Sequence, residues 1–271
     1  MSIRNKTKGV KMKSKVALAV VAVLGIFFVQ PAEANQGKSL VIIDSYFDSR
    51  SVKDNVVCIT LSSNTPCIDE RNAKIASPLS SNVNHGNAMI EVAKKQNPNI
   101  KIIALKSAGT STADVNAGNF LEALKWINNN SSNIGAVSIS RNLGTTKGSE
   151  CIMPVRNIDA KTGDQQIRSL ISVLSQKNIP IFAATGNTFG STKIDYPACI
   201  SSVNAVTAPG LADNTTVKYS ADLVTLPGIG NNFSSTLFNL IPLTTSTATV
   251  AVATQYLVNG ISPIKLVKVN A

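Results

Sequence analysis

The arrangement of apolar segments along the chain is the feature that most limits its fold. Short apolar runs of strand length alternate with longer amphipathic segments of helical periodicity. We expect strands at 40–43, 100–105, 136–140, 179–184 and 203–208, and helices at 85–96, 113–128 and 163–177. Strands and helices that alternate in this way predict a parallel sheet with helices packed on both faces. The pattern therefore predicts an α/β fold of three layers with a mainly parallel central sheet.

Residues 1–34 have the pattern of a signal peptide. Basic residues precede the apolar run Val16–Val29, and Ala32-Glu33-Ala34 has the small-x-small form that signal peptidases accept. The run has 14 residues, whereas a membrane-spanning helix needs about 20. An uncleaved membrane anchor is the alternative interpretation. We predict an exported chain, secreted or periplasmic, whose mature part, 35–271, is a single domain.

The basic character of the chain comes largely from this first segment. The whole chain has 26 basic and 15 acidic residues, and the segment holds six of the basic ones and one acid. The mature part keeps 20 basic against 14 acidic residues, a net charge of +6. These charges are spread along the chain with few aromatic residues nearby, so they do not indicate nucleic-acid binding.

Four cysteines in an exported chain favour two disulfides. Three pairings are possible in principle. Cys58 and Cys67 flank a short polar segment and are expected to close a local loop, which leaves Cys151 to pair with Cys199. Metal binding is the weaker interpretation, because the chain has no CxxC spacing and only one histidine.

Polar residues with catalytic potential stand at the ends of the expected strands and helices. Asp44, Ser140 and Asn187 follow apolar strands, and His85 and Ser246 stand at expected helix starts. Ligands bind at the carboxyl edge of such sheets, so all five can converge there. Each residue also has a structural interpretation when taken alone, such as a turn residue after a strand or a helix N-cap. Their joint order, Asp, His, Asn and Ser, favours a catalytic set.

These segments resemble the subtilase (subtilisin-like serine protease) family, and the resemblance covers essentially the whole mature chain. VIIDSYFD is similar to the family's Asp strand, HGNAMIEVA to its His motif and VSIS to its Asn-Met-Ser strand. IFAATGN is similar to the Ala-Ala-Gly-Asn strand, DYPACISSVNAVTA to the Tyr-Pro-Ala stretch, ADLVTLPG to the segment before the nucleophile and TTSTATVAVAT to the Ser motif. The resemblance implies a three-layer subtilisin-like fold.

The resemblance also assigns catalytic roles. Ser246 would be the nucleophile, His85 the general base, and Asp44 the residue that orients the imidazole. A serine hydroxyl needs such a base because it is too weakly acidic to attack an amide unaided. Asn187 would donate its side-chain amide to the oxyanion together with the Ser246 backbone N–H. We therefore expect a serine endopeptidase.

Substrate binding is implied in the same way. Ser140 would lie on the strand that pairs with an extended polypeptide, and Arg141 and Gly186 would belong to the same substrate-binding edge. This chemistry requires no cofactor. Structural calcium is common in the family, but no dense Asp/Asn loop indicates a site in this chain. We expect a monomer that acts on polypeptides, with neither nucleic acid nor, after signal cleavage, membrane as a partner.

Several positions depart from the family pattern. Thr244 and Tyr46 replace glycines near the expected triad, and Arg141-Asn142 replaces the usual Leu-Gly. Only residues 35–43 separate the expected cleavage site from Asp44, where many subtilases have a prodomain. These departures motivate a second hypothesis, a catalytically inactive subtilase-fold protein that binds peptides or an envelope partner. An esterase with the same triad is a third, although nothing in the sequence suggests a lipid pocket or lid.

Overall fold

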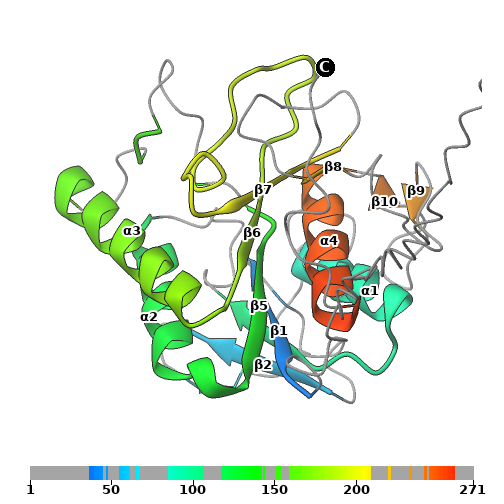
Figure 1. Cartoon of the computed structure of the whole chain (residues 1–271). Coiled ribbons are helices and arrows are strands. Elements are labelled where there is room, and N and C mark those ends of the chain that lie inside the picture. Colours follow the sequence, from blue (N-terminus) through cyan, green and yellow to red (C-terminus); the bar gives the residue numbers. More distant parts are fainter. Residues whose placement is uncertain are drawn as a thin grey trace, which may run out of the picture. The chain divides into compact units, whose positions relative to one another are not determined.

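The apolar strands assemble into one mixed sheet in the computed structural model of the chain. Its order is β3-β2-β4-β1-β5-β6-β7-β8, and every pairing is parallel except β2 with β3 (Figure 1). The strands are β1 (Ser39–Asp44), β2 (Val56–Thr60), β3 (Thr65–Pro66), β4 (Ile102–Lys106), β5 (Ile134–Ile139), β6 (Ile181–Ala184), β7 (Asn204–Thr207) and β8 (Tyr219–Ser220). A separate antiparallel pair comprises β9 (Asn232–Phe233) and β10 (Ile241–Pro242).

The structure describes a defined part of the chain. The described residues are 37–44, 47, 55–61, 65–66, 85–106, 117–141, 143, 151–153, 159–208, 219–220, 232–233, 241–242 and 244–259. All of them belong to one compact unit, Pro31–Ala271, and a second unit covers Met1–Gln30. The expected signal peptide therefore lies outside the described residues, as do Tyr46, Cys67 and Asn142.

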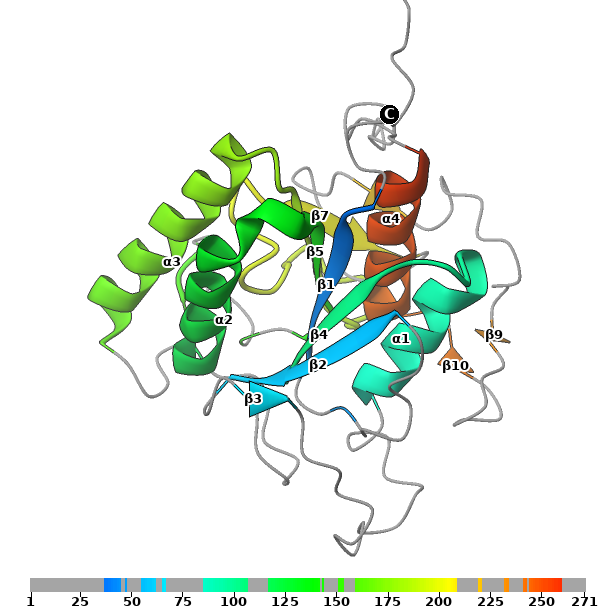
Figure 2. The same ribbon diagram turned by 90° about the horizontal axis from the view of Figure 1, so that it is seen from below.

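Helices cover both faces of the sheet. Figures 1 and 2 show α2 (Ala117–Asn129) and α3 (Ala160–Gln176) on one face, and α1 (His85–Gln96) and α4 (Thr245–Asn259) on the other. A short 3₁₀ helix, Ser131–Asn133, precedes β5. Within the described residues, no helix is both long and apolar enough to cross a membrane. The observed layers confirm the predicted three-layer α/β fold.

Strand alternation decides which face each side chain of β1 joins. All six residues of β1 are buried. Leu40 and Ile42 belong to the core cluster that contains α1 and α4, and Val41 and Ile43 belong to the cluster that contains α2 and α3. Successive side chains of a strand point to opposite faces, so Asp44 lies on the same face as Leu40 and Ile42. The last residue of β1 therefore projects toward α1 and α4.

The start of α3 differs from the sequence-based prediction. The helix begins at Ala160 and not at residue 163, because Asp159 is its N-cap and accepts a hydrogen bond from the Thr162 backbone N–H at 2.7 Å. The same hydrogen bond lowers the pKa of the Asp159 carboxyl from its ordinary value. The observed α2 covers 117–129 instead of 113–128, and residues 113–116 lie outside the described part.

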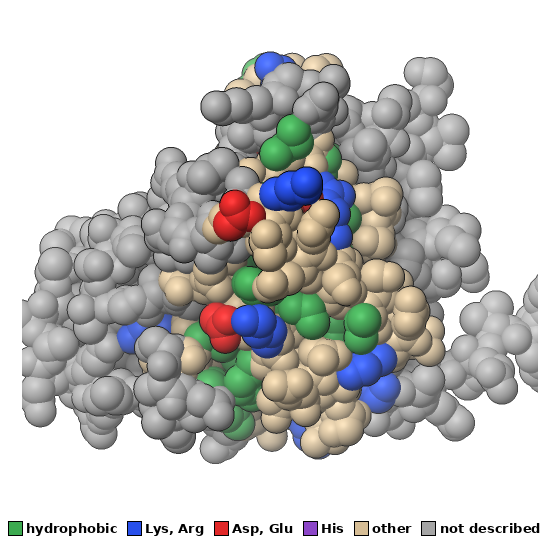
Figure 3. All heavy atoms as spheres, turned by 90° about the vertical axis from the view of Figure 1, so that its left-hand side faces the viewer, with side chains coloured by type: hydrophobic (Ala, Val, Ile, Leu, Met, Phe, Trp, Pro, Cys, Tyr) green, Lys and Arg blue, Asp and Glu red, His purple; other side chains and the backbone are tan. Residues whose placement is uncertain are grey.

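The outer surface over α2 and α3 carries scattered charges. In Figure 3 the Lys and Arg side chains lie at separate places among polar groups. Two surface pairs join neighbouring turns, Lys125 with Glu122 at 2.8 Å and Arg168 with Asp164 at 2.7 Å. The Lys125–Glu122 pair is exposed, and pairs of this kind contribute at most about 1 kcal/mol to the free energy of unfolding.

A disulfide and an arginine connect α3 with the segment after β6. Cys151 is bonded to Cys199, which confirms the predicted long-range pairing. Cys58 is also disulfide-bonded, while Cys67, its expected partner, lies outside the described residues. Arg168 donates from Nη2 to the Cys151 carbonyl. Nearby, burial of the Tyr196 ring raises the pKa of its phenol.

The turn after β6 depends on a glycine. Gly186 has φ +107°, and a Cβ on it would lie 2.4 Å from Asp195 Oδ2. Two backbone hydrogen bonds fix the turn: Thr185 donates to Val206 at 3.0 Å, and Asp195 donates to Thr185 at 2.9 Å. The backbone conformation and the close carboxylate together exclude any larger residue at 186.

Replacing this glycine should disturb the turn that carries Asn187. We expect Gly186→Ala to lower the free energy of unfolding by about 2–4 kcal/mol, through left-handed strain and overpacking against Asp195. Gly190→Ala is the matched control, because Gly190 also has positive φ (+66°) but a Cβ added there would have no atom within 4 Å; it should cost about 1 kcal/mol. Urea denaturation measures both. Equal costs would show that Asp195 does not constrain the turn.

Loss of the Cys151–Cys199 bond should also destabilise the fold. The two residues are 48 positions apart, so the double Cys→Ala variant should lose about 2–4 kcal/mol of unfolding free energy. Chemical denaturation measures the loss. Non-reducing peptide mapping should recover the Cys151–Cys199 peptide pair, and a peptide that joins Cys58 to Cys151 would contradict the arrangement.

Candidate active site

Three neighbouring parallel strands bring the predicted polar residues to one edge of the sheet. Asp44 is the last residue of β1, and Ser140 directly follows β5, the strand beside it. β6 pairs with the other side of β5 and ends at Ala184, three residues before Asn187. The carboxyl ends of these strands lie at the same edge, where ligands bind in open α/β sheets.

His85 contacts Asp44 directly. It is the first residue of α1, and its Nδ1 lies 2.6 Å from Asp44 Oδ2. The Asp44 side chain is fully buried, and the imidazole is 22% exposed. An ionised carboxylate can only accept hydrogen bonds, so Nδ1 carries a proton, and in the neutral form of the ring Nε2 then keeps its lone pair. The imidazole is therefore held in the tautomer that a general base requires.

The second oxygen of Asp44 is bound by an arginine. Arg141 Nε donates to Asp44 Oδ1 at 3.3 Å, and the arginine side chain is 17% exposed. A buried carboxylate needs partners for both oxygens, because its desolvation costs several kcal/mol. The sequence predicted Arg141 as a substrate-binding residue but gave no sign of this contact.

A lysine flanks Asp44 on the other side. Lys106 ends β4, is only 4% exposed, and lies in register with Asp44 across the β1–β4 pair. Alternation along β4 puts Lys106 on the same face as Ile102 and Ala104, which belong to the cluster containing α1 and α4. The sequence analysis missed this residue. Its signal is a single charged residue at the end of an otherwise apolar strand.

Ser246 is bonded to the end of β5. It is the second residue of α4 and is 6% exposed. Its Oγ donates to the Ser140 carbonyl at 2.7 Å, and Ser140 Oγ donates to the Ser246 carbonyl at 3.3 Å. Among the contacts of the described residues, no hydrogen bond joins Ser246 to His85. The predicted residues thus form two hydrogen-bonded groups, which meet where Ser140 adjoins Arg141.

Asn187 has a fixed amide orientation. Its Oδ1 accepts two hydrogen bonds from Thr245, one from the backbone N–H at 3.1 Å and one from the hydroxyl at 2.8 Å. Since Oδ1 faces the start of α4, the Nδ2 group faces the opposite way, and the residue is exposed. Sequence reasoning missed Thr245 as the residue that sets this orientation; its only signal is its place directly before Ser246.

Thr244, which stands where the subtilase pattern has a glycine, has a structural role in this chain. It precedes α4, and its Oγ1 accepts a hydrogen bond from the Thr247 backbone N–H at 3.4 Å. In return its own N–H donates to Thr247 Oγ1 at 2.8 Å. Thr244 is therefore the N-cap of the helix that carries Ser246.

The described residues contain no group of three or more His, Cys, Asp or Glu side chains placed to hold a metal ion.

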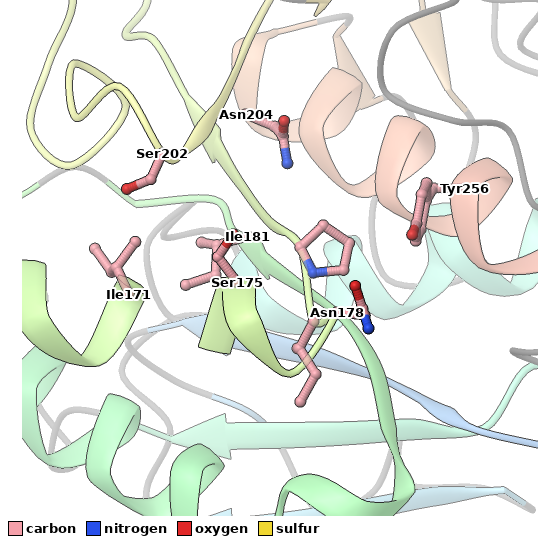
Figure 4. A pocket seen from close by; sticks show the side chains of 9 residues that line it. Ile171, Ser175, Asn178, Ile181, Ser202, Asn204 and Tyr256 are labelled. Carbon is pink, nitrogen blue, oxygen red and sulfur yellow. The ribbon is translucent and has the colours of Figure 1, made fainter. Parts of the chain in front are cut away.

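A cavity of about 320 Å³ lies at the other edge of the sheet, where β6 and β7 begin, between α3 and α4 (Figure 4). Its lining is Ile171, Ser175, Asn178, Ile179, Pro180, Ile181, Ser202, Asn204 and Tyr256. Because it faces away from the carboxyl ends of the strands, this cavity is separate from the candidate site.

Comparison with known proteins gives a likeness in structure and none in sequence. No family model and no curated protein sequence matches the chain. The prenylagaramide maturation protease PagA is similar in structure, with a TM-score of 0.55 and 16% identity over 84% of this chain and 76% of that one. A cold-adapted subtilisin-like serine proteinase has a TM-score of 0.54 and 16% identity over 84% and 78% of the two chains.

A further similar structure is the nisin leader peptidase NisP from Lactococcus lactis. Its TM-score is 0.51, with 13% identity over 82% of this chain and 77% of that one. These proteins share the layered α/β arrangement described above, at identities that show the fold alone. The chain therefore has the subtilisin-like fold that the sequence resemblance predicted.

Proposed function

We propose that the chain is an exported subtilisin-like serine endopeptidase. The observation that carries the proposal is the 2.6 Å contact between His85 Nδ1 and the buried Asp44 carboxylate. This contact leaves Nε2 as a base and stabilises the imidazolium that forms when the base takes a proton. A Ser-His-Asp mechanism requires this contact between His85 and Asp44. An aspartate that only formed a turn and a histidine on the surface would not make it.

In this mechanism Ser246 attacks the carbonyl carbon of a peptide bond. Its hydroxyl exchanges the hydrogen bond to Ser140 for one to His85 Nε2, which requires a rotation about the Ser246 Cα–Cβ bond. His85 takes the proton as the C–O bond forms and later gives it to the leaving amine. Water then hydrolyses the acyl-enzyme by the same route.

Asn187 stabilises the negative charge that develops on the carbonyl oxygen. Thr245 holds Asn187 Oδ1, so Nδ2 is oriented as a donor before substrate arrives. The Ser246 backbone N–H at the start of α4 is the second donor, and the positive end of the helix dipole reinforces it. The donors cost little to reorganise during the reaction because α4 and the β6 turn already fix them.

The setting proposed for this activity is outside the cytoplasm. The signal-peptide pattern of residues 1–34 supports export, and the Cys151–Cys199 disulfide is typical of secreted or periplasmic proteins. The substrate is a polypeptide that pairs with the segment following β5, and the enzyme acts as a monomer without a cofactor.

A second candidate function is peptide binding without catalysis. Two contacts favour it: Ser246 Oγ is engaged by the Ser140 carbonyl and not by His85, and Arg141 shares the Asp44 carboxylate with His85. Under this hypothesis the edge of the sheet binds an extended peptide, but Ser246 does not react.

Covalent labelling distinguishes the two functions. A fluorophosphonate probe should label the purified chain at Ser246, because the probe reacts only with an activated serine. Ser246→Ala should abolish labelling, and His85→Ala should lower its rate by several orders of magnitude. Ser202→Ala, a change at an exposed serine on the opposite edge, should label like the wild type. A folded wild-type chain that stays unlabelled would support the binding function.

The oxyanion role of Asn187 has its own test. In subtilisin the loss of such a donor lowers kcat by about 10²–10³, and we expect a similar loss for Asn187→Ala with little change in KM. Asn187→Asp keeps an acceptor for Thr245 but removes the Nδ2 donors, and should lose as much. Steady-state kinetics on a peptide substrate give both parameters. Full turnover by the aspartate variant would show that Nδ2 does not contact the oxyanion.

A further inference from the structure

Arg141 has donor groups that the fold does not use. Its Nε binds Asp44 Oδ1 at 3.3 Å, but neither Nη atom has a hydrogen-bond partner among the described residues. A guanidinium presents five N–H donors in a rigid plane, and the two Nη groups match the two oxygens of a carboxylate. The contact with Asp44 uses the Nε edge of this plane, and the side chain stays 17% exposed.

The guanidinium lies beside the reacting groups. Arg141 directly follows Ser140, whose carbonyl contacts Ser246, and its side chain reaches the carboxylate that holds His85. An extended peptide bound along the segment after β5 therefore places one of its side chains next to His85 and the Nη groups. Successive side chains of an extended peptide point in opposite directions, so only certain positions of the peptide face Arg141.

The charge distribution at this edge also favours an anion near His85. Lys106 ends the strand on the other side of Asp44 and lies in register with it, so the single carboxylate has a cation on each neighbouring strand. A buried acid, Asp195, lies against Gly186 after the end of β6. Arg141, with its side chain 17% exposed, is therefore the group at this edge that can attract a negative side chain.

A purely structural role accounts for only part of Arg141. Neutralising Asp44 explains the bond from Nε, but it needs neither the bidentate Nη pair nor a side chain that stays 17% exposed at the edge of the site. We propose that Arg141 selects peptides by binding an aspartate or glutamate side chain next to His85. The inference rests on the proposed function, because it names the substrate class of that site.

Peptide binding to the full chain carrying Ser246→Ala tests the inference without turnover. A series of labelled peptides carries either Glu or Gln at one position, and that position is changed from peptide to peptide. Fluorescence anisotropy gives the Kd of each peptide. Glu should bind about tenfold tighter than Gln at one position, the effect of a charged hydrogen-bonded pair. Adding Arg141→Gln should remove the preference, and Arg141→Lys should keep part of it. Lys193→Gln removes an exposed charge of the β6 segment and should leave the preference unchanged.

The ratio of the Glu and Gln affinities separates recognition from structure. If Arg141 only supports Asp44, its loss weakens both peptides equally and the ratio stays the same; circular dichroism confirms that each variant is folded. Equal binding of Glu and Gln at every position, or no measurable binding of either, contradicts the inference. Labelling of wild-type Ser246 without a Glu preference supports the proposed protease and overturns only the inference. A preference for Glu that depends on Arg141, together with no labelling of Ser246, supports the inference and contradicts the proposed protease function.

Discussion

The buried charge of Asp44 is the constraint on which the edge of the sheet depends. A carboxylate with no exposed surface must be neutralised within the protein, and its two oxygens are bound by groups from different elements. His85 comes from the first turn of α1, and Arg141 comes from the segment after β5. One side chain therefore fixes a helix start and a strand end to the same point. The stability of the fold and the orientation of the imidazole depend on the same carboxylate.

Much of the fold follows from the sequence because its pattern is regular. Alternating strands and helices predicted the parallel sheet, and the apolar runs predicted both ends of β1, β4, β5, β6 and β7 to within two residues. The face on which Asp44 lies was harder to predict. Every residue of β1 is buried, so hydrophobicity does not distinguish its two faces, and only the partners of Leu40 and Val41 in the core do so.

The sequence nominated the members of the candidate site, but it did not indicate the contacts between them. The order of Asp44, His85, Asn187 and Ser246 and their places at element ends were visible in the sequence. The partners were not, because a long side chain or a rotatable hydroxyl can reach several groups within a few ångströms. Arg141 on Asp44 is such a contact. Thr244 shows the converse: a departure from a family pattern that has a local structural explanation as a helix cap.

The reciprocal bonds between Ser140 and Ser246 give the edge a property beyond holding two elements together. The Ser140 carbonyl that accepts the Ser246 hydroxyl belongs to the backbone with which an extended peptide would pair. A peptide N–H that donates to this carbonyl would compete with the Ser246 hydroxyl for it and would favour the move of that hydroxyl to another acceptor. Binding of a peptide and release of the Ser246 hydroxyl from the Ser140 carbonyl would then occur together. In the proposed protease, Ser246 would therefore stay inactive until a peptide binds, and the substrate would also act as the activator.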